Sequence, residues 1–381
     1  MDTTTQSHPF HVVIAGGGVA ALEAMIALRD LAGERVRITL LAPGDAFHYR
    51  PLAVAEPFSI AHALEVPLAR LAGEFHAELV VGELAAVEPA ERRIVTGDGR
   101  RIGYDALLVA CGTRTRPAFH GVHTIDDRDV GETLRGLVQD IEEGYTHDVT
   151  FVAPAQTFWP LPLYELALQT ARRAFDVEAM VDISIVSPEA APLGLFGAGI
   201  SDELARLLRG AGIAFHGSVF ADYRNGELTL NPGGRVTRPS RVVALPLLEG
   251  PRVAGLPRDP SGFIPVGRLG EVFGLDGVYA AGDTTCFPIK HGGLAAQQAD
   301  VVAAAIAGSA GVAVTPRPVE PVICGTLLTG GAPRFFEAEL TDGGGFRSTV
   351  SDVCPWDAPA KIVARHLGPY LAREGRHAVG A

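Results

Sequence analysis

The chain has 381 residues, 47% of them hydrophobic and 20% charged, so it can bury a sizeable core and is long enough for two or three domains. A formal net charge of −12 without an arginine-rich block excludes nucleic acid as an expected partner. The four cysteines, Cys111, Cys286, Cys324 and Cys354, form no CxxC pair, which argues against a disulfide scaffold and predicts no metal site.

Targeting signals are not evident in the sequence. No basic segment followed by a cleavable apolar core precedes residue 11, and the longest apolar run, residues 301–314, is too short to span a membrane. We therefore expect a cytoplasmic protein, with peripheral contact to a membrane left open. The sequence gives no indication of the oligomeric state.

The N-terminal pattern predicts a βαβ unit. HVVIA (11–15) is typical of a buried strand, residues 20–31 of a helix, and RVRITLLA (35–42) of the next strand. The carboxylate that commonly ends the second strand and binds ribose is replaced by Ala42.

A glycine loop joins the first strand to the helix. Gly16, Gly18 and Ala21 have G-x-G-x-x-A spacing, with Val19 and Ala20 between them. Glycines let the backbone approach a pyrophosphate, whose charge then lies at the helix N-terminus. The loop therefore predicts dinucleotide binding.

Short strands with turn signals follow, including a GDG hairpin turn at 97–99 and YDALLVACGT, which ends near Gly112. A second βαβ unit is expected at 148–154, 163–175 and 182–188. The next helix pattern begins at Ser201, a candidate cap, and stops at Gly210.

The stretch AGDTTCFPIKHGGLAAQQAD (281–300) combines a Gly-Asp pair at a strand end with a lysine and a glycine-led helix. The Asp283 carboxylate suits the hydroxyl groups of a sugar-like chain. The helix beginning near Gly292 can direct free N–H groups and its positive dipole end at an electron-rich ring. FAD contains both a sugar-like chain with hydroxyl groups and an electron-rich ring. Lys290 is one of only two lysines, the other being Lys361, in a chain that otherwise uses arginine.

GGGVAALEA, YDALLVACGT and GVYAAGDTT followed by PIKHGGLAAQQAD resemble the three FAD segments of the FAD-dependent pyridine nucleotide-disulfide oxidoreductase superfamily. Within it the chain is most similar to sulfide:quinone oxidoreductases, flavocytochrome c sulfide dehydrogenase flavoproteins and type II NADH dehydrogenases. The resemblance runs over nearly the whole chain. It implies an α/β fold with two Rossmann-like, glutathione-reductase-type dinucleotide-binding domains and a small C-terminal region.

The resemblance also implies domain limits and site residues. The expected FAD domain comprises residues 1–116 and 264–316, the second Rossmann-like domain 117–263, and the C-terminal region 317–381. The candidate FAD-binding residues are Gly16, Gly18, Val19, Ala20, Ala21, Arg50, Gly112, Gly282, Asp283, Lys290, Gly292, Gly293 and Leu294.

The second nucleotide loop departs from the nicotinamide-using members. VAPAQTFWPLPLYELA has no glycine between Val152 and Ala167, while Phe158, Trp159 and several prolines are too bulky and rigid to cradle a pyrophosphate. Direct reduction by NAD(P)H is therefore the less favoured alternative.

Three residues are candidates for catalysis: Cys324, Glu165 and Lys290. By resemblance, Cys324 matches the C-terminal cysteine of sulfide oxidisers and Glu165 lies where a proton relay faces the flavin. The partner cysteine is absent, because Thr157, Phe158 or Trp159 stands in its place, and neither Cys111 nor Cys286 obviously replaces it. A two-cysteine mechanism is thus in doubt, and a single-thiol mechanism or a substrate without sulfur stays open.

The C-terminal region contains a second set of candidates. Phe335, Phe336, Trp356 and Tyr370 either line a quinone pocket or pack in the core, and KIVARHLGPYLAREG (361–375) predicts an amphipathic helix.

The favoured function is a sulfide:quinone-reductase-like oxidoreductase, passing two electrons from a small reductant through FAD to a quinone or a protein carrier. The alternatives are an NAD(P)H-dependent quinone or ferredoxin reductase and an FAD-binding redox-sensing or interaction protein.

Overall fold

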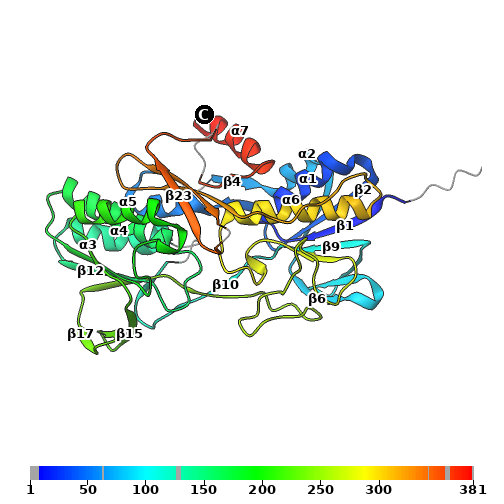
Figure 1. Cartoon of the computed structure of the whole chain (residues 1–381). Helices are drawn as coiled ribbons and strands as arrows, with labels where there is room; N and C mark the ends of the chain where they lie inside the picture. Colours follow the sequence, from blue (N-terminus) through cyan, green and yellow to red (C-terminus); the bar gives the residue numbers. More distant parts are fainter. Residues whose placement is uncertain (1–7, 62–63, 126–129, 342, 357–360, 380–381) are drawn as a thin grey trace, which may run out of the picture.

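The computed structural model describes residues 8–61, 64–125, 130–341, 343–356 and 361–379. Two five-stranded parallel sheets organise the chain, one on the right and one on the left of Figure 1. The predicted α/β class, with two Rossmann-like sheets, is confirmed.

The first sheet has the strand order β20-β9-β1-β2-β5 and is parallel throughout. Its strands are β1 (Phe10–Ala15), β2 (Val36–Ala42), β5 (Ala77–Val81), β9 (Ala106–Val109) and β20 (Val278–Ala280). Strand β20 comes from far along the chain, so this sheet is assembled from two separate segments.

Alternating side chains of β1 fill the two faces of this sheet. Val12 and Ile14 pack against helices α1 (Val19–Ala32) and α6 (Gly292–Ser309). Val13 and Ala15 pack on the other face, under an antiparallel meander. The strands of that meander are β6 (Leu84–Glu88), β7 (Arg93–Thr96) and β8 (Arg101–Gly103).

The second sheet repeats this plan in the order β11-β18-β12-β13-β14. Its strands are β11 (His123–Thr124), β12 (Asp148–Val152), β13 (Asp182–Val186), β14 (Ala214–His216) and β18 (Arg241–Ala244). The associated helices are α3 (Val130–Glu142), α4 (Leu161–Asp176) and α5 (Ala198–Gly210), and the meander is β15 (Phe220–Arg224), β16 (Glu227–Asn231) and β17 (Arg235–Thr237).

A short ribbon of β10 (Arg114–Arg116) and β19 (Leu247–Glu249) joins the two halves. The C-terminal region contributes an antiparallel sheet of β21 (Val322–Leu327), β22 (Arg334–Leu340) and β23 (Phe346–Ser351). Helix α7 (Leu367–Val379) ends the described chain above α1 and α2 in Figure 1.

The remaining elements are short. They are β3 (Ala46–Tyr49), β4 (Leu64–Pro67), α2 (Leu68–Glu74) and the 3-10 helices η1 (Gly33–Arg35), η2 (Arg50–Phe58), η3 (Pro89–Glu91), η4 (Gly194–Phe196) and η5 (Gly282–Thr284). No helix of the described residues has the length and apolar character needed to cross a bilayer.

Two helix starts differ from the sequence predictions. Helix α5 begins at Ala198 with Gly197 as its N-cap, so Ser201 lies buried within its first turn instead of capping it. Helix α7 begins at Leu367, so residues 361–366 are not helical. The second difference has a tertiary cause, because a buried glutamate from α1 binds the backbone N–H groups of His366 and Leu367.

Candidate functional site

The glycine loop lies between the end of β1 and the first turn of α1. Gly16 has φ 142°, and a Cβ on it would lie 2.1 Å from the carbonyl oxygen of Ala110 after β9. Gly18 is the N-cap of α1, and no heavy atom lies within 4 Å of a Cβ built on it. Among the described residues, no side chain caps α1. The open space beside Gly18 and the uncapped helix end fit a pyrophosphate.

The third predicted FAD segment meets the first. Gly282 has φ 78°, and a Cβ on it would lie 3.0 Å from that of Ala20 in α1 and 3.3 Å from that of Ala295 in α6. Its N–H donates to Oε1 of Gln298 at 2.7 Å. Asp283 follows within η5, at the junction of α1, α6 and β20. The structure thus brings together segments that are more than 250 residues apart in the sequence.

The other predicted FAD-binding residues differ in their positions. Val19 and Ala21 lie with Ala20 in the first turn of α1, and Gly112 follows β9 with φ 70°. Arg50 is exposed at the start of η2, and its proposed role stays a prediction.

Lys290 is buried, with 5% of its surface exposed. Its ammonium donates to the carbonyl oxygens of Thr285 and Phe287, the latter at 2.8 Å, and lies 3.8 Å from the ring centroid of Phe263. Burial lowers the pKa of Lys290 to about 8, although the nearby Asp283 acts in the opposite direction. A proton can therefore leave this group near neutral pH.

The amino end of α6 is closely packed. Gly292 and Gly293 open the helix and Leu294 is buried in its first turn. A Cβ on Gly292 would lie 2.5 Å from Cδ1 of Ile362, and one on Gly293 would lie 2.9 Å from Cε1 of His291. A larger residue at either position would require Ile362 or His291 to shift.

His291, the N-cap of α6, is a site residue that sequence reasoning missed. It is 6% exposed, its Nδ1 has no hydrogen-bond partner among the described residues, and its ring lies 4.6 Å from that of Trp159. Burial lowers the pKa of His291 to about 4, so the ring is neutral at pH 7.

Glu165 is buried on α4 and paired with Lys361. The Nζ atom of Lys361 donates to both carboxylate oxygens at 2.7 Å, and the N–H of Leu328 donates to Oε1 at 2.8 Å. The two side chains are 1% and 8% exposed. Burial raises the pKa of Glu165, and Lys361 opposes this shift. Lys361 was not a predicted site residue, yet its rarity as one of two lysines was a usable signal.

Cys324 lies on β21, beside Glu337 of β22. Burial, assisted by Glu337, raises the pKa of the Cys324 thiol to about 11, so the thiol is protonated at neutral pH. All four cysteines are free. Thr157, in the loop where a partner thiol was expected, donates its hydroxyl to the carbonyl oxygen of Pro154.

The second nucleotide loop is filled by aromatic side chains. Trp159 lies between His291 and Phe196, at centroid distances of 4.6 and 5.2 Å, and Phe158 contacts Phe263 at 5.4 Å. Pro160 occupies the N-cap position of α4 without a capping hydrogen bond from its side chain, and Pro162 lies in the first turn. Proline has no N–H, so this helix end offers fewer donors to a phosphate than α1 does.

The carboxylate that follows the next strand of the second sheet, β13, is already hydrogen-bonded within the protein. Glu189 accepts hydrogen bonds from the hydroxyl of buried Tyr164 at 2.5 Å and from Ser187 at 3.3 Å. Tyr164 thus bonds the acidic group that follows β13, near the position at which a Rossmann domain holds ribose.

The C-terminal aromatic candidates do not form one group. Phe335 contacts Trp356 at 5.7 Å, and Phe336 is buried beneath Gly325. Tyr370 packs instead against Phe75 at 5.9 Å, in the core of the first sheet. Core packing therefore accounts for Phe336 and Tyr370.

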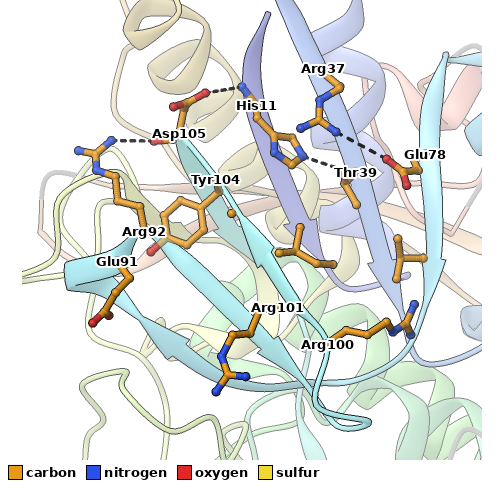
Figure 2. A pocket seen from close by; sticks show the side chains of 13 residues that line it. His11, Arg37, Thr39, Glu78, Glu91, Arg92, Arg100, Arg101, Tyr104 and Asp105 are labelled. Carbon is orange, nitrogen blue, oxygen red and sulfur yellow. Dashed lines mark hydrogen bonds and ion pairs between the residues drawn. The ribbon is translucent and has the colours of Figure 1, made fainter. Parts of the chain in front are cut away.

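A cavity of 810 Å³ lies away from the glycine loop. Figure 2 shows it at the amino ends of β1, β2 and β5, where Arg37 pairs with Glu78, and Asp105 accepts from the His11 N–H and from Arg92. A cavity of 490 Å³ occupies the equivalent place between the second sheet and its meander. The repetition indicates a property of the fold, so we assign the functional site to the glycine loop, at the carboxyl ends of the strands.

Known proteins resemble this chain in sequence and fold. Residues 10–143 match the model of the pyridine nucleotide-disulphide oxidoreductase family. The sulfide-quinone reductase of Aquifex aeolicus (strain VF5) is 30% identical over 246 residues, which are 61% of this chain and 53% of that protein. The matched segment thus spans about half the length of this curated relative.

Solved structures extend the likeness to most of the chain. The sulfide:quinone oxidoreductase of Aquifex aeolicus superposes with a TM-score of 0.82 at 20% identity, covering 90% of this chain and 87% of the other. The ferredoxin reductase of the CYP199A2 system from Rhodopseudomonas palustris gives 0.66 at 19% identity, covering 87% and 83%. The resemblance found in the sequence is thus confirmed: the N-terminal part of the chain matches the pyridine nucleotide-disulphide oxidoreductase family, and most of the chain shares the fold of these solved oxidoreductases.

Proposed function

We propose that the chain is an FAD-dependent oxidoreductase of the sulfide:quinone-reductase-like type, which passes two electrons from a small reductant to a quinone or another carrier. The observation that carries the proposal is the contrast between an open glycine loop at Gly18 and a second loop filled by Trp159 and two prolines. The loop after β1 therefore suits a nucleotide cofactor, and the loop after β12 does not.

In this proposal the cofactor is held by the three meeting segments. Gly16 and Gly18 bind the pyrophosphate, Asp283 the ribityl hydroxyls, and the amino end of α6 lies toward the ring. Bound FAD would supply the two-electron redox chemistry. The buried, neutral His291 and the cation of Lys290 would border the ring end of the site.

The donor is proposed to be a small molecule other than NAD(P)H. The rings of Trp159 and His291 lie 4.6 Å apart, so an aromatic side chain of the second loop packs against the N-cap residue of α6. Glu189 already accepts from Tyr164. Both observations support a donor that does not need a ribose or pyrophosphate site in the second domain.

Cys324 is the thiol proposed to meet a sulfur substrate. Because its pKa is raised to about 11, a nearby base must take its proton before it can act as a nucleophile. No partner cysteine occupies the Thr157 loop, so we favour a single-thiol route. Glu165 remains the candidate proton relay, now with Lys361 holding its carboxylate.

The acceptor is proposed to be a quinone or a protein carrier, and a quinone acceptor would require contact with a membrane surface. The comparisons supply this idea, since both the sequence relative and the solved structure from Aquifex aeolicus carry quinone in their names.

An anaerobic titration tests the proposal. The purified protein, loaded with FAD, is mixed in separate cuvettes with NADH, NADPH, sulfide and a small thiol, and flavin absorption is followed. Bleaching by sulfide or the thiol alone is the expected result. Rapid bleaching by micromolar NADH or NADPH would instead establish a nicotinamide-dependent reductase, and absence of turnover with every donor and acceptor pair would indicate a redox sensor.

A further inference from the structure

Three side chains of types that commonly bind metals meet where α1, α6 and the C-terminal region pack together. Glu23 lies on α1, Asp300 lies on α6, and His366 directly precedes α7. One carboxylate oxygen of each acid and one ring nitrogen of His366 lie within 4.8 Å of one another. Among the described residues, no other three histidine, cysteine, aspartate or glutamate side chains are grouped in this way.

The backbone of the C-terminal region holds Glu23 in place. Glu23 is fully buried. Its Oε1 accepts from the N–H of His366 at 2.8 Å, and its Oε2 accepts from that of Leu367 at 2.6 Å. An ionised carboxylate offers about four lone-pair positions, so each oxygen retains a position for another partner. A cation can therefore approach this carboxylate without displacing either hydrogen bond.

A carboxylate of α1 orients the imidazole of His366. The Nδ1 atom of His366 lies 2.9 Å from Oδ2 of Asp30. A neutral His366 that donates from Nδ1 to Asp30 keeps the lone pair of Nε2 available. Metal-binding histidines are commonly oriented by such a carboxylate, which fixes the tautomer and raises the basicity of the ring. We therefore expect Nε2 to be the nitrogen that binds an ion.

Asp300 supplies an oxygen without a partner. Its Oδ1 is buried and accepts no hydrogen bond from the described residues, and it lies 3.7 Å from Nε2 of His366. This separation is too long for a hydrogen bond. Two atoms that each bind one metal ion at about 2.1 Å can lie up to about 4.2 Å apart, so this pair can share an ion. A buried oxygen without a partner is costly, which indicates that a partner is missing.

The charges of this cluster favour a cation. The carboxylates of Glu23, Asp30 and Asp300 lie around one imidazole. Arg365 belongs to the same segment as His366 but is exposed, so solvent screens its charge. The side chains of His366 and Asp300 are 17% and 27% exposed, which leaves an entry path for an ion. The cluster is thus rich in negative charge, partly buried and accessible from solvent.

We propose that Glu23, Asp300 and His366 bind one divalent transition-metal ion of the manganese(II) type, with Asp30 orienting the histidine. Carboxylate oxygens suit Mn²⁺ as well as Mg²⁺ and Ca²⁺, whereas an imidazole nitrogen favours a transition metal. Water completes the coordination. Because the three ligands come from α1, α6 and the segment before α7, the ion fastens the C-terminal region to two helices that pack on the first sheet.

Sequence spacing could not indicate this site. Glu23 and His366 are 343 positions apart, and the absence of paired cysteines bears only on thiolate sites. None of the proposed metal ligands is a proposed FAD ligand, so the metal site can form whether or not the chain binds flavin.

Manganese binding to the metal-free protein tests the proposal without any flavin. The full chain is freed of metals with EDTA, desalted and titrated with MnCl₂, while the EPR signal of free Mn²⁺ is followed. We expect one bound Mn²⁺ per chain. Asp30→Asn, which alters the orienting acid, should weaken binding about 10–100-fold, and Asp300→Asn, which removes a ligand charge, should weaken it more. Equal affinity in the wild type and Asp300→Asn would overturn the proposal.

Pulsed EPR of the bound ion identifies its ligands. Mn²⁺ at the proposed site should show the hyperfine coupling of a histidine nitrogen, and His366→Gln should remove this coupling. Asp140→Asn, which alters an acid paired with Arg241 in the second half of the chain, should behave like the wild type. Mn²⁺ bound without nitrogen coupling would be an adventitious ion only, and the proposed site would be wrong. Should Asp300→Asn fail to fold, His366→Gln still decides, because retention of the coupling in that variant contradicts the site.

Hydrogen exchange measures how the ion fastens the C-terminal region. Mass spectrometry follows peptides covering residues 361–374. Mn²⁺ at about ten times its dissociation constant should slow the exchange of the His366 and Leu367 amides about tenfold in the wild type. The same amides in Asp300→Asn should exchange at equal rates with and without Mn²⁺. An unchanged rate in the wild type would place the bound ion elsewhere and refute the site.

Discussion

The two sheets share one plan, yet the loops that follow their first strands have opposite properties. After β1, Gly16 lets the backbone pass close to Ala110, and Gly18 leaves an open space at the start of α1. After β12, Pro160 and Pro162 remove donors from the start of α4, and Trp159 fills the space. A Rossmann topology thus provides the place for a nucleotide, and the loop residues decide whether the place is open.

The same contrast extends to the acidic positions. Glu189, which follows β13, is occupied by the Tyr164 hydroxyl, whereas β2 ends at Ala42 without a carboxylate. In the first half, Asp283 follows a different strand, and its proposed partner is the ribityl chain and not a ribose. The family match over residues 10–143 likewise ends before the filled loop.

The largest expected effect is on the open loop. Gly18→Val should place a branched side chain in the space proposed for the pyrophosphate, weakening FAD binding by at least 100-fold, or about 3 kcal/mol. Because no protein atom lies within 4 Å of the new Cβ, the unfolding temperature without cofactor should change little. Flavin content and a thermal scan measure the two effects.

Gly73→Val in α2 is the matched control, since that glycine also has open space around its Cβ but lies outside the loop. Full flavin content in Gly18→Val would show that the cofactor lies elsewhere.

An intermediate effect is expected at Glu165, in the helix after the filled loop. Glu165→Gln leaves the Lys361 cation buried without a charged partner, which should lower the free energy of unfolding by about 3 kcal/mol. Asp176→Asn breaks the exposed pair with Arg172 on the same helix and should cost less than about 1 kcal/mol. Urea unfolding compares them, and equal costs would contradict a structural role for the buried pair.

The smallest effect is expected at Tyr164. Tyr164→Phe removes the hydroxyl that bonds Glu189 while keeping the buried ring, at a cost of about 1–2 kcal/mol in stability. Because Trp159 and the prolines remain, NADH should still fail to reduce the flavin rapidly. Rapid reduction in this variant would mean that the Tyr164–Glu189 bond alone keeps nicotinamide out.

Much of the first half was predictable because its signals are local. A strand, a G-x-G-x-x-A turn and a helix follow one another within residues 10–32. The third predicted FAD segment is recognisable from the Gly282–Asp283 pair. The α/β class followed from the same patterns. The domain limits remain predictions, since no observation tests the individual boundaries.

Other features depended on distant contacts. Lys361 and Glu165 are 196 positions apart, and neither residue indicates the other in the sequence. The start of α7 was placed too early because the amphipathic pattern begins before residue 367. Glu23, 344 positions away, caps the helix at Leu367. His291 gave no distinctive signal beside Lys290.

The sequence by itself determined where backbone approaches backbone, as at Gly16, and where a helix start lacks N–H donors, as at Pro162, because glycine has no Cβ and proline has no N–H. Tertiary structure alone decided which charges are buried together: Lys361 with Glu165, and Glu23 with Asp300 and His366. Burial and proximity set the pKa values of such groups, and both arise only when helices far apart in the chain pack against one another.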